Sequence, residues 1–329
     1  MKHILMIATG GTIASKETAD GLTPQLTSEE LLAEVPELEQ LCRIDTVQLM
    51  NRDSTNINSR DWLQMAACVR EHYDGYDGFV LTHGTDTMGY TAGALYYMLR
   101  GIVVPVALTG SMLPLTAAGT DARANLRGAF AVAASGRAGV YQAFAGCVIS
   151  GNAVKKVDST ARDAFRSIGR PQAGTFALAD GALTWQVPEE ARAEAAKMDD
   201  ETQAAFAPQF ALDERVAVVK LVPGAEPRLR TALADAGYRA VIIEGYGAGG
   251  VPTAASPKNF LPAIVDLRAR GVRVICATQC TTGGVHLDTY EMGVLAARCG
   301  AESAGDLPLE ALVPKTMLEL AQADGVQTV

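Results

Sequence analysis

Short apolar runs bounded by glycine recur along this chain, with segments of helical periodicity between them. This alternation is typical of β–α units, in which parallel strands form a sheet and the connecting helices cover its faces. The sequence therefore predicts an α/β fold. In the first half, we expect buried strands at residues 4–8, 79–82, 104–108 and 147–150, and amphipathic helices at residues 60–72, 87–99 and 121–134. Asp121 is a suitable N-cap residue for the last helix.

A change in composition divides the chain. From about Asp180 to Gln209 the sequence is rich in Ala and Glu, which favours a hairpin and a polar connector. Further strands are then expected at 216–221, 240–244 and 272–277, and helices at 228–236, 257–270 and 290–299. Because 329 residues are many for a single core, we predict two domains. They are a larger N-terminal α/β domain with a parallel sheet and flanking helices at 1–190, a linker at 191–212, and a smaller C-terminal α/β domain at 213–329.

Charge, hydropathy and cysteine spacing exclude several classes of protein. The formal net charge of −9 argues against nucleic acid as a partner, because phosphate binding relies on clustered Lys and Arg. The first apolar run is too short to cross a membrane and lacks a signal cleavage pattern, so we expect a cytoplasmic protein. The six cysteines do not have zinc-ligand spacing, so we expect reduced thiols and no metal.

The segment Ala8-Thr9-Gly10-Gly11-Thr12 directly follows the first predicted strand. Ligands of open α/β sheets bind beyond the carboxyl ends of the strands. Two glycines allow a sharp turn close to a small ligand, and the Thr12 hydroxyl would then point into the binding crevice. An ordinary turn is the alternative interpretation. A nucleotide site is disfavoured, because the G-x-G-x-x-G spacing and the P-loop lysine are both absent.

A second polar segment, residues 82–88, also lies between a predicted strand and a predicted helix. Several polar side chains and a glycine at the end of a strand are hard to explain by core packing. Asp86 and Thr87 are alternatively caps of the following helix. His83 is expected to be a structural, hydrogen-bonding histidine.

Two further segments are ambiguous by themselves. Residues 53–58 have the composition of a polar loop with a turn. Residues 151–159 include the tandem lysines Lys155 and Lys156, which are normally a solvated pair. A lysine that reaches into a desolvated crevice can instead assist proton transfer from a hydroxyl.

Taken together and in this order, these segments resemble the bacterial-type L-asparaginase family, most closely its cytoplasmic type I members. The resemblance covers essentially the whole chain, and two of its motifs are long. The matching residues are Thr9-Gly10-Gly11-Thr12-Ile13-Ala14, His83-Gly84-Thr85-Asp86-Thr87-Met88, Leu108-Thr109-Gly110-Ser111-Met112-Leu113-Pro114, Asn125-Leu126, Lys156, and Glu244-Gly245-Tyr246-Gly247-Ala248-Gly249-Gly250.

The resemblance implies hydrolysis of L-asparagine to L-aspartate and ammonia, without a metal or an organic cofactor. It implies that Thr12 attacks the amide carbon. Thr85, Asp86 and Lys156 would form a second catalytic group, in which the lysine lowers the cost of deprotonating Thr85. Family active sites lie at a dimer interface, so the resemblance also implies a homodimer or a homotetramer.

The same resemblance implies a set of substrate contacts. Asp86 would bind the α-ammonium group by a charge-assisted hydrogen bond, and Ser54, with Thr55 beside it, would bind the α-carboxylate. Ser111 would line the amide end of the pocket. Backbone N–H groups around Thr12 and Thr85, including the loop glycines Gly11 and Gly84, would stabilise the developing oxyanion.

The chain departs from the family pattern in the loop after Thr12. Many members carry a tyrosine there that contacts the first threonine and helps to activate it. Here the loop reads Ala19-Asp20-Gly21-Leu22-Thr23-Pro24, with Leu22 or Gly21 at that place. The group that activates Thr12 is therefore not identified by the sequence.

Three other functions compete with an asparaginase. An amidotransferase component that acts on glutamyl-tRNA would carry an additional N-terminal domain, whereas this chain begins at the predicted catalytic strand. A dual glutaminase-asparaginase differs in substrate by one methylene, which changes selectivity by only about 1–3 kcal/mol. A sensor would bind asparagine through Ser54 and Asp86 without turnover.

Overall fold

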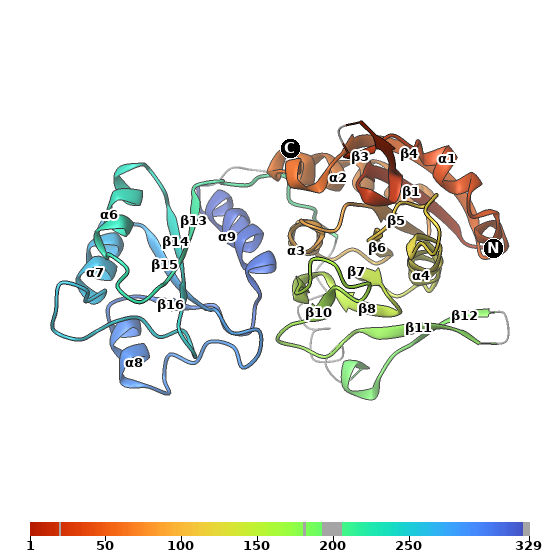
Figure 1. Ribbon diagram of the computed structural model, residues 1–329. Coiled ribbons are helices and arrows are strands. Elements are labelled where there is room, and N and C mark those ends of the chain that lie inside the picture. Colours follow the sequence, from red (N-terminus) through yellow and green to blue (C-terminus); the bar gives the residue numbers. More distant parts are fainter. Residues whose placement is uncertain (20, 180–181, 193–205, 325–329) are drawn as a thin grey trace. The chain divides into compact units, whose positions relative to one another are not determined.

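The structure is a computed structural model that describes residues 1–19, 21–179, 182–192 and 206–324 (Figure 1). The chain forms two compact units, one from Met1 to Phe210 and a second that begins at Ala211. The boundary between the units lies inside the predicted linker at 191–212, of which residues 193–205 are outside the described residues. The predicted domain limits themselves stay predictions.

The first unit is built on an eight-stranded sheet in the order β12-β11-β8-β7-β6-β5-β1-β4. Neighbouring strands from β4 to β7 are parallel, whereas β8, β11 and β12 are joined by antiparallel pairs. The strands are β1 (His3–Gly10), β4 (Arg43–Arg52), β5 (Gly78–Thr82), β6 (Pro105–Thr109), β7 (Gly139–Phe144), β8 (Cys147–Ser150), β11 (Gly174–Ala179) and β12 (Ala182–Gln186). Two small hairpins, β2 (Ser15–Thr18) with β3 (Gly21–Pro24) and β9 (Val154–Lys156) with β10 (Phe165–Ser167), stand beside this sheet.

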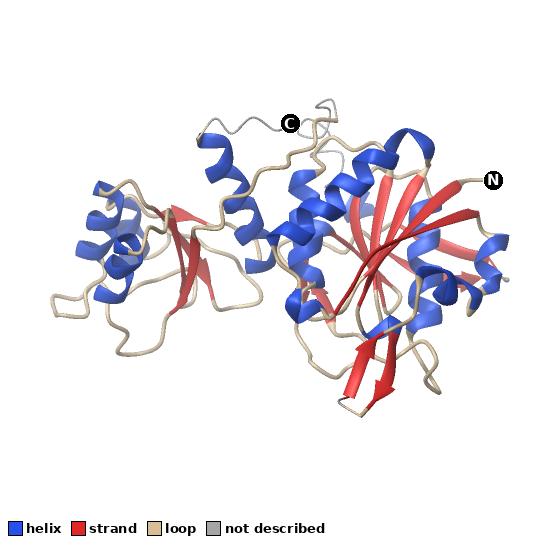
Figure 2. Cartoon of the chain, turned by 90° about the horizontal axis from the view of Figure 1, so that it is seen from above, coloured by secondary structure: helices blue, strands red, loops and turns tan. Residues whose placement is uncertain are grey.

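Helices cover both faces of the large sheet (Figure 2). One face, which includes Ile4, Met6 and Val80, packs on α1 and α4 in a single apolar core. The helices of this unit whose bounds lie fully within the described residues are α1 (Ser28–Ala33), α2 (Ser59–His72), α3 (Met88–Met98) and α4 (Ala122–Ala134), with the 3-10 turns η1 (Thr12–Ala14), η2 (Pro36–Gln40), η3 (Ser54–Asn56), η4 (Tyr73–Gly75) and η5 (Gly151–Ala153). No helix among the described residues is long and apolar enough to cross a membrane.

The second unit contains a four-stranded parallel sheet in the order β13-β14-β15-β16. Its strands are β13 (Val216–Lys220), β14 (Ala240–Gly245), β15 (Arg273–Thr278) and β16 (Glu302–Ser303). Its helices are α6 (Arg228–Asp235), α7 (Leu261–Ala269), α8 (Glu291–Arg298) and α9 (Leu309–Ala323). The predicted α/β class is therefore confirmed in both units.

Two local predictions need correction. The helix expected at 257–270 begins only at Leu261, because residues 256–259 form a turn and the Asn259 side chain accepts a hydrogen bond from the Leu261 backbone N–H. Asp121 occupies the N-cap position of α4, but its side chain makes no capping bond there. Its carboxylate instead accepts hydrogen bonds from the backbone of Met112 and Leu113.

Candidate active site

The predicted site segments follow neighbouring parallel strands. The order β6-β5-β1-β4 places the loops that carry Ser111, Thr85, Thr12 and Ser54 at one edge of the sheet, because parallel strands all end there. The sheet topology thus brings together four segments that are separated by up to about 100 residues in the sequence.

The turn that carries Thr12 depends on two glycines. Gly10 has φ 105° and Gly11 has φ 82°, a conformation that other residues rarely adopt. A Cβ atom on Gly11 would lie 2.2 Å from the backbone nitrogen of Gly84, so the two loops touch through backbone atoms. Thr12 itself is half-buried, and among the described residues its hydroxyl has no hydrogen-bond partner.

Thr85 lies in a different environment, because its buried hydroxyl is paired. The ammonium group of Lys156 donates to Thr85 Oγ1 over 2.8 Å and to Asp86 Oδ1 over 2.7 Å. The Lys156 side chain is 16% exposed, whereas that of Asp86 is 56% exposed and accessible to a ligand. An ammonium group at this distance stabilises the alkoxide form of the Thr85 hydroxyl, so the group is suited to proton transfer.

Lys156 reaches Thr85 by an indirect path. Strand β8 is antiparallel to β7 and ends where β7 begins, since Ser150 pairs with Tyr141. The chain therefore leaves β8 at the opposite edge of the sheet. It returns along α3, where a Cβ on Gly151 would lie 2.8 Å from the Ala92 carbonyl oxygen, and it then places Lys156 beside Thr85.

Ser54 is buried against the Thr85 segment. Its hydroxyl accepts a hydrogen bond from the Asp86 backbone N–H over 3.2 Å, and its carbonyl accepts one from the Thr87 hydroxyl over 2.7 Å. Thr87 occupies the N-cap position of α3, and its side chain makes no capping bond there. Thr55 is exposed, and its hydroxyl donates to the Asp53 carboxylate over 2.6 Å, so the two members of the predicted pair differ in surroundings.

Ser111 is buried in the loop after β6, where its hydroxyl donates to the carbonyl of Leu113. This loop lies against both threonine segments. His83 N–H donates to the Thr109 carbonyl over 2.8 Å, at the start of the loop, and Leu115 N–H donates to the Ile13 carbonyl over 3.2 Å, next to Thr12.

His83 supports Gly84 through a chain of buried hydrogen bonds that the sequence did not reveal. A carbonyl oxygen can only accept, so His83 Nδ1–H donates to the Gly84 carbonyl over 2.7 Å, and Nε2 is left to accept from the Thr91 hydroxyl over 2.9 Å. Trp62 Nε1–H donates in turn to Thr91 Oγ1 over 3.1 Å. Burial lowers the pKa of His83 from 6.5 to about 4, against the opposing effect of the Gly84 bond, so the ring is neutral at pH 7. The prediction of a structural histidine agrees with this arrangement.

The loop after Thr12 forms the β2–β3 hairpin, in which Leu22 pairs with Glu17. Leu22, one of the two residues at the place expected for a tyrosine, is 52% exposed, and the other, Gly21, has no side chain. An aliphatic side chain cannot exchange a proton with Thr12, so this position supplies no activating group.

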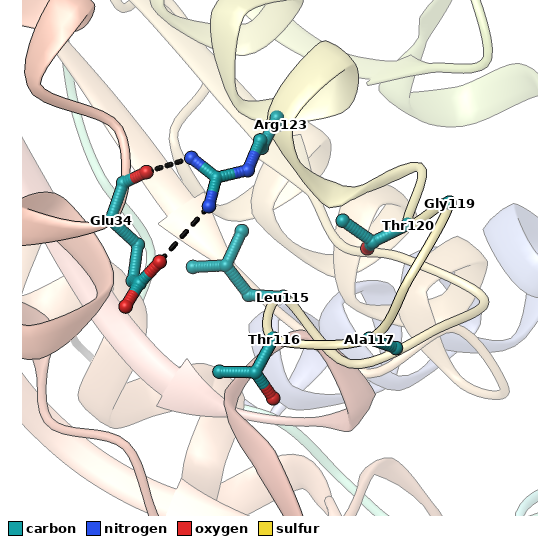
Figure 3. Close-up of a pocket in the computed structure, with 7 residues that line it drawn as sticks. All are labelled: Glu34, Leu115, Thr116, Ala117, Gly119, Thr120 and Arg123. Carbon is teal, nitrogen blue, oxygen red and sulfur yellow. Dashed lines mark hydrogen bonds and ion pairs between the residues drawn. The ribbon is translucent and has the colours of Figure 1, made fainter.

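A separate pocket lies beyond the Ser111 loop, and Figure 3 shows the residues around it. None of the predicted site residues lines it. Arg123 donates to the Glu34 carboxylate over 2.9 Å, and both side chains are partly exposed, so its two charged groups neutralise each other. The lining residues are Glu34, Leu115, Thr116, Ala117, Gly119, Thr120 and Arg123.

Two family models match the chain. The model "Asparaginase, N-terminal" matches residues 3–189, and the model "Glutaminase/Asparaginase C-terminal domain" matches residues 215–329. An L-asparaginase of Thermococcus kodakarensis is 37% identical over 327 residues, which cover 99% of this chain and 95% of that protein. A glutamyl-tRNA(Gln) amidotransferase subunit of Pyrococcus furiosus is 34% identical over 95% of this chain and 69% of that protein.

Solved structures of similar proteins have the same fold. The thermostable L-asparaginase from Thermococcus kodakarensis superposes with a TM-score of 0.85 at 36% identity, covering 97% of this chain and 93% of that one. A probable cytoplasmic L-asparaginase from Campylobacter jejuni superposes with a TM-score of 0.79 at 27% identity, covering 97% of this chain and 95% of that one.

Proposed function

The chain belongs to the asparaginase family, and we propose that it hydrolyses L-asparagine to L-aspartate and ammonia with Thr12 as the nucleophile. The observation that carries the proposal is the meeting of the Thr12 turn with the Thr85–Asp86–Lys156 group through Gly11 and Gly84. An amide needs a hydroxyl nucleophile and a route for protons, and both kinds of group are present at this edge of the sheet.

Recognition of the amino acid would use two opposite charges. Asp86 has one carboxylate oxygen bonded to Lys156, while its half-exposed side chain can still accept from an α-ammonium group. Ser54 lies one hydrogen bond from the Asp86 backbone, so its hydroxyl is placed to donate to the α-carboxylate. Thr55 would contribute at the rim, and Ser111 would line the amide end.

The reaction would proceed in two steps. Thr12 Oγ bonds to the amide carbon, the C–N bond breaks, and the hydroxyl proton leaves with the amine as ammonia. Water then cleaves the ester, which releases aspartate and returns a proton to Thr12. Backbone N–H groups beside Gly11 and Gly84 would stabilise the oxyanion, at about 3–4 kcal/mol per donor. The Lys156–Thr85 pair would carry the proton between nucleophile and leaving group.

The similarity to the amidotransferase of Pyrococcus furiosus supports a second candidate, in which the chain supplies ammonia to a partner enzyme. A dual glutaminase-asparaginase would use the same residues. We also propose that the chain assembles as a homodimer or a homotetramer, which light scattering on purified protein can test.

The test is ammonia release from L-asparagine by the purified chain alone. We expect turnover by the wild type, a fall of about a thousandfold or more in Thr12→Ala and Thr85→Ala, and little change in Thr116→Ala, an exposed threonine that lines the separate pocket. Parallel assays with L-glutamine measure selectivity.

Binding of asparagine without turnover would identify a sensor instead. Turnover that appears only with an added amidotransferase partner would favour the second candidate. Equal activity in Thr12→Ala would contradict the assigned nucleophile.

A further inference from the structure

The carboxylate of Asp121 collects hydrogen bonds from three separate parts of the first unit. Oδ2 accepts from the Met112 N–H over 2.8 Å and from Asn125 Nδ2 over 3.2 Å. Oδ1 accepts from the Leu113 N–H over 3.0 Å and from Arg162 over 2.7 Å. The Asp121 side chain is 12% exposed, so the bonds from Met112, Leu113 and Asn125 are shielded from water, whereas the bond from the 48% exposed Arg162 lies at the surface. None of these bonds is a helix-capping bond from the α4 backbone.

Two of these donors fix the loop that carries Ser111. Met112 and Leu113 are held by Asp121, and the carbonyl of Leu113 accepts from the Ser111 hydroxyl. Asn125 adds a bond to the Gly110 carbonyl over 3.0 Å. The loop is therefore bonded at consecutive residues. Its far end bonds to Ile13 next to Thr12, so its position also sets that of the Thr12 turn.

The remaining donor, Arg162, comes from the hairpin that carries Lys156. In this hairpin Lys156 pairs with Phe165 and Val157 N–H donates to the Ala164 carbonyl over 2.8 Å, so Arg162 lies in its connecting loop. The Arg162–Asp121 ion pair thus joins the Lys156 hairpin to the Ser111 loop.

We propose that Asp121 and Arg162 are positioning residues that hold the Lys156 hairpin and the Thr12 turn at a fixed separation. The inference rests on the proposed function, in which Lys156 and Thr12 act on one substrate. Neither Asp121 nor Arg162 touches the reacting atoms. Their effect is on the geometry between two groups that must act together, and small displacements of such groups are costly to the rate.

The same hairpin offers a matched control. Arg166 also forms an ion pair, with Asp163 over 3.0 Å, and its side chain is 49% exposed against 48% for Arg162. The Arg166 pair stays inside the hairpin, whereas the Arg162 pair reaches Asp121 beside α4. Arg162→Gln and Arg166→Gln therefore remove similar surface charges, but only the first breaks the connection.

The experiment combines amide hydrogen exchange with steady-state kinetics on both variants and on the wild type. In Arg162→Gln we expect exchange at residues 110–115 to become about threefold faster, and kcat to fall about threefold to tenfold with KM within about twofold. Arg162→Lys should recover most of kcat. Arg166→Gln should leave residues 110–115 and kcat near wild type.

A double-mutant cycle with Asp121→Asn then tests the pairing. We expect the double variant to lose no more kcat than Asp121→Asn alone, because each change breaks the same contact. If Asp121→Asn does not fold, Arg162→Gln at the surface still decides the question. Unchanged exchange at 110–115 together with unchanged kcat in Arg162→Gln would overturn the inference. If the wild type releases no ammonia, the proposed function fails, while the exchange data still report whether Arg162 holds the Ser111 loop.

Discussion

The two threonines of the candidate site differ in how completely their surroundings are built. Thr85 is buried, its hydroxyl is bonded to Lys156, and the preceding Gly84 is held by His83. Thr12 is only half-buried and its hydroxyl has no partner among the described residues. The surroundings of Thr85 are thus organised in the free chain, and we expect those of Thr12 to be completed by the substrate or by another group.

The largest expected effect comes from removing the Lys156 ammonium group beside Thr85. Lys156→Met deletes the ammonium group that bonds Thr85 and Asp86, so we expect kcat for asparagine to fall about a thousandfold. Lys155→Met is the matched control, because it changes the adjacent lysine of the same strand, and it should keep activity within about threefold. Ammonia release measures both. A larger loss in Lys155→Met would show that the wrong lysine has been assigned.

The next effect concerns the free energy of unfolding of the first unit at low pH, which depends on His83. The pKa of His83 is about 4 in the folded chain against 6.5 for the free group, so the unfolded state binds more protons between these values. The contribution of His83 to the free energy of unfolding is therefore fully present above pH 6.5. It is lost as the pH falls towards 4, which lowers the free energy of unfolding by about 3 kcal/mol. In His83→Gln, the free energy of unfolding should not show this part of the fall with pH.

Urea titrations between pH 8 and pH 4.5 measure this difference. Trp62 and Trp185 are the two tryptophans of the chain and both belong to the first unit, so their fluorescence reports on its unfolding. Parallel pH profiles of the wild type and His83→Gln would contradict the buried neutral histidine.

The smallest expected effect concerns the surroundings of Thr12. Leu22→Tyr places a phenol at the family position for contact with the first threonine, and we expect kcat to rise about tenfold because Thr12 gains a proton-exchanging partner. Leu22→Phe supplies the ring without the hydroxyl and should not raise kcat. If tyrosine and phenylalanine give the same rate, the hairpin does not activate Thr12.

The sequence predicted the parts of the site that follow strands. Thr12 and Thr85 come directly after apolar runs, and parallel strands end at one edge, so their proximity could be expected. The position of Lys156 beside Thr85 could not be expected from the sequence, because β8 runs antiparallel and the chain must return along α3. Lys156 itself was assigned through the family resemblance.

The role of Asp121 was missed for a related reason. Its position before an amphipathic helix is typical of an N-cap, and local sequence carries no sign of bonds to Met112, Leu113 and Arg162. The His83–Thr91–Trp62 chain likewise joins α2 to α3 and the Thr85 loop through side chains that local sequence patterns do not relate. Patterns along the chain predict elements and their ends, whereas such contacts depend on tertiary packing.

The central claim is that Thr12 attacks the substrate while the Thr85 group moves protons. Acid quenching during turnover of L-asparagine, followed by peptide mass spectrometry, tests it directly. We expect an aspartyl ester on the peptide that contains Thr12, absent in Thr12→Ala. An ester on the peptide that contains Thr85, in the wild type and equally in Thr12→Ala, would contradict the assignment.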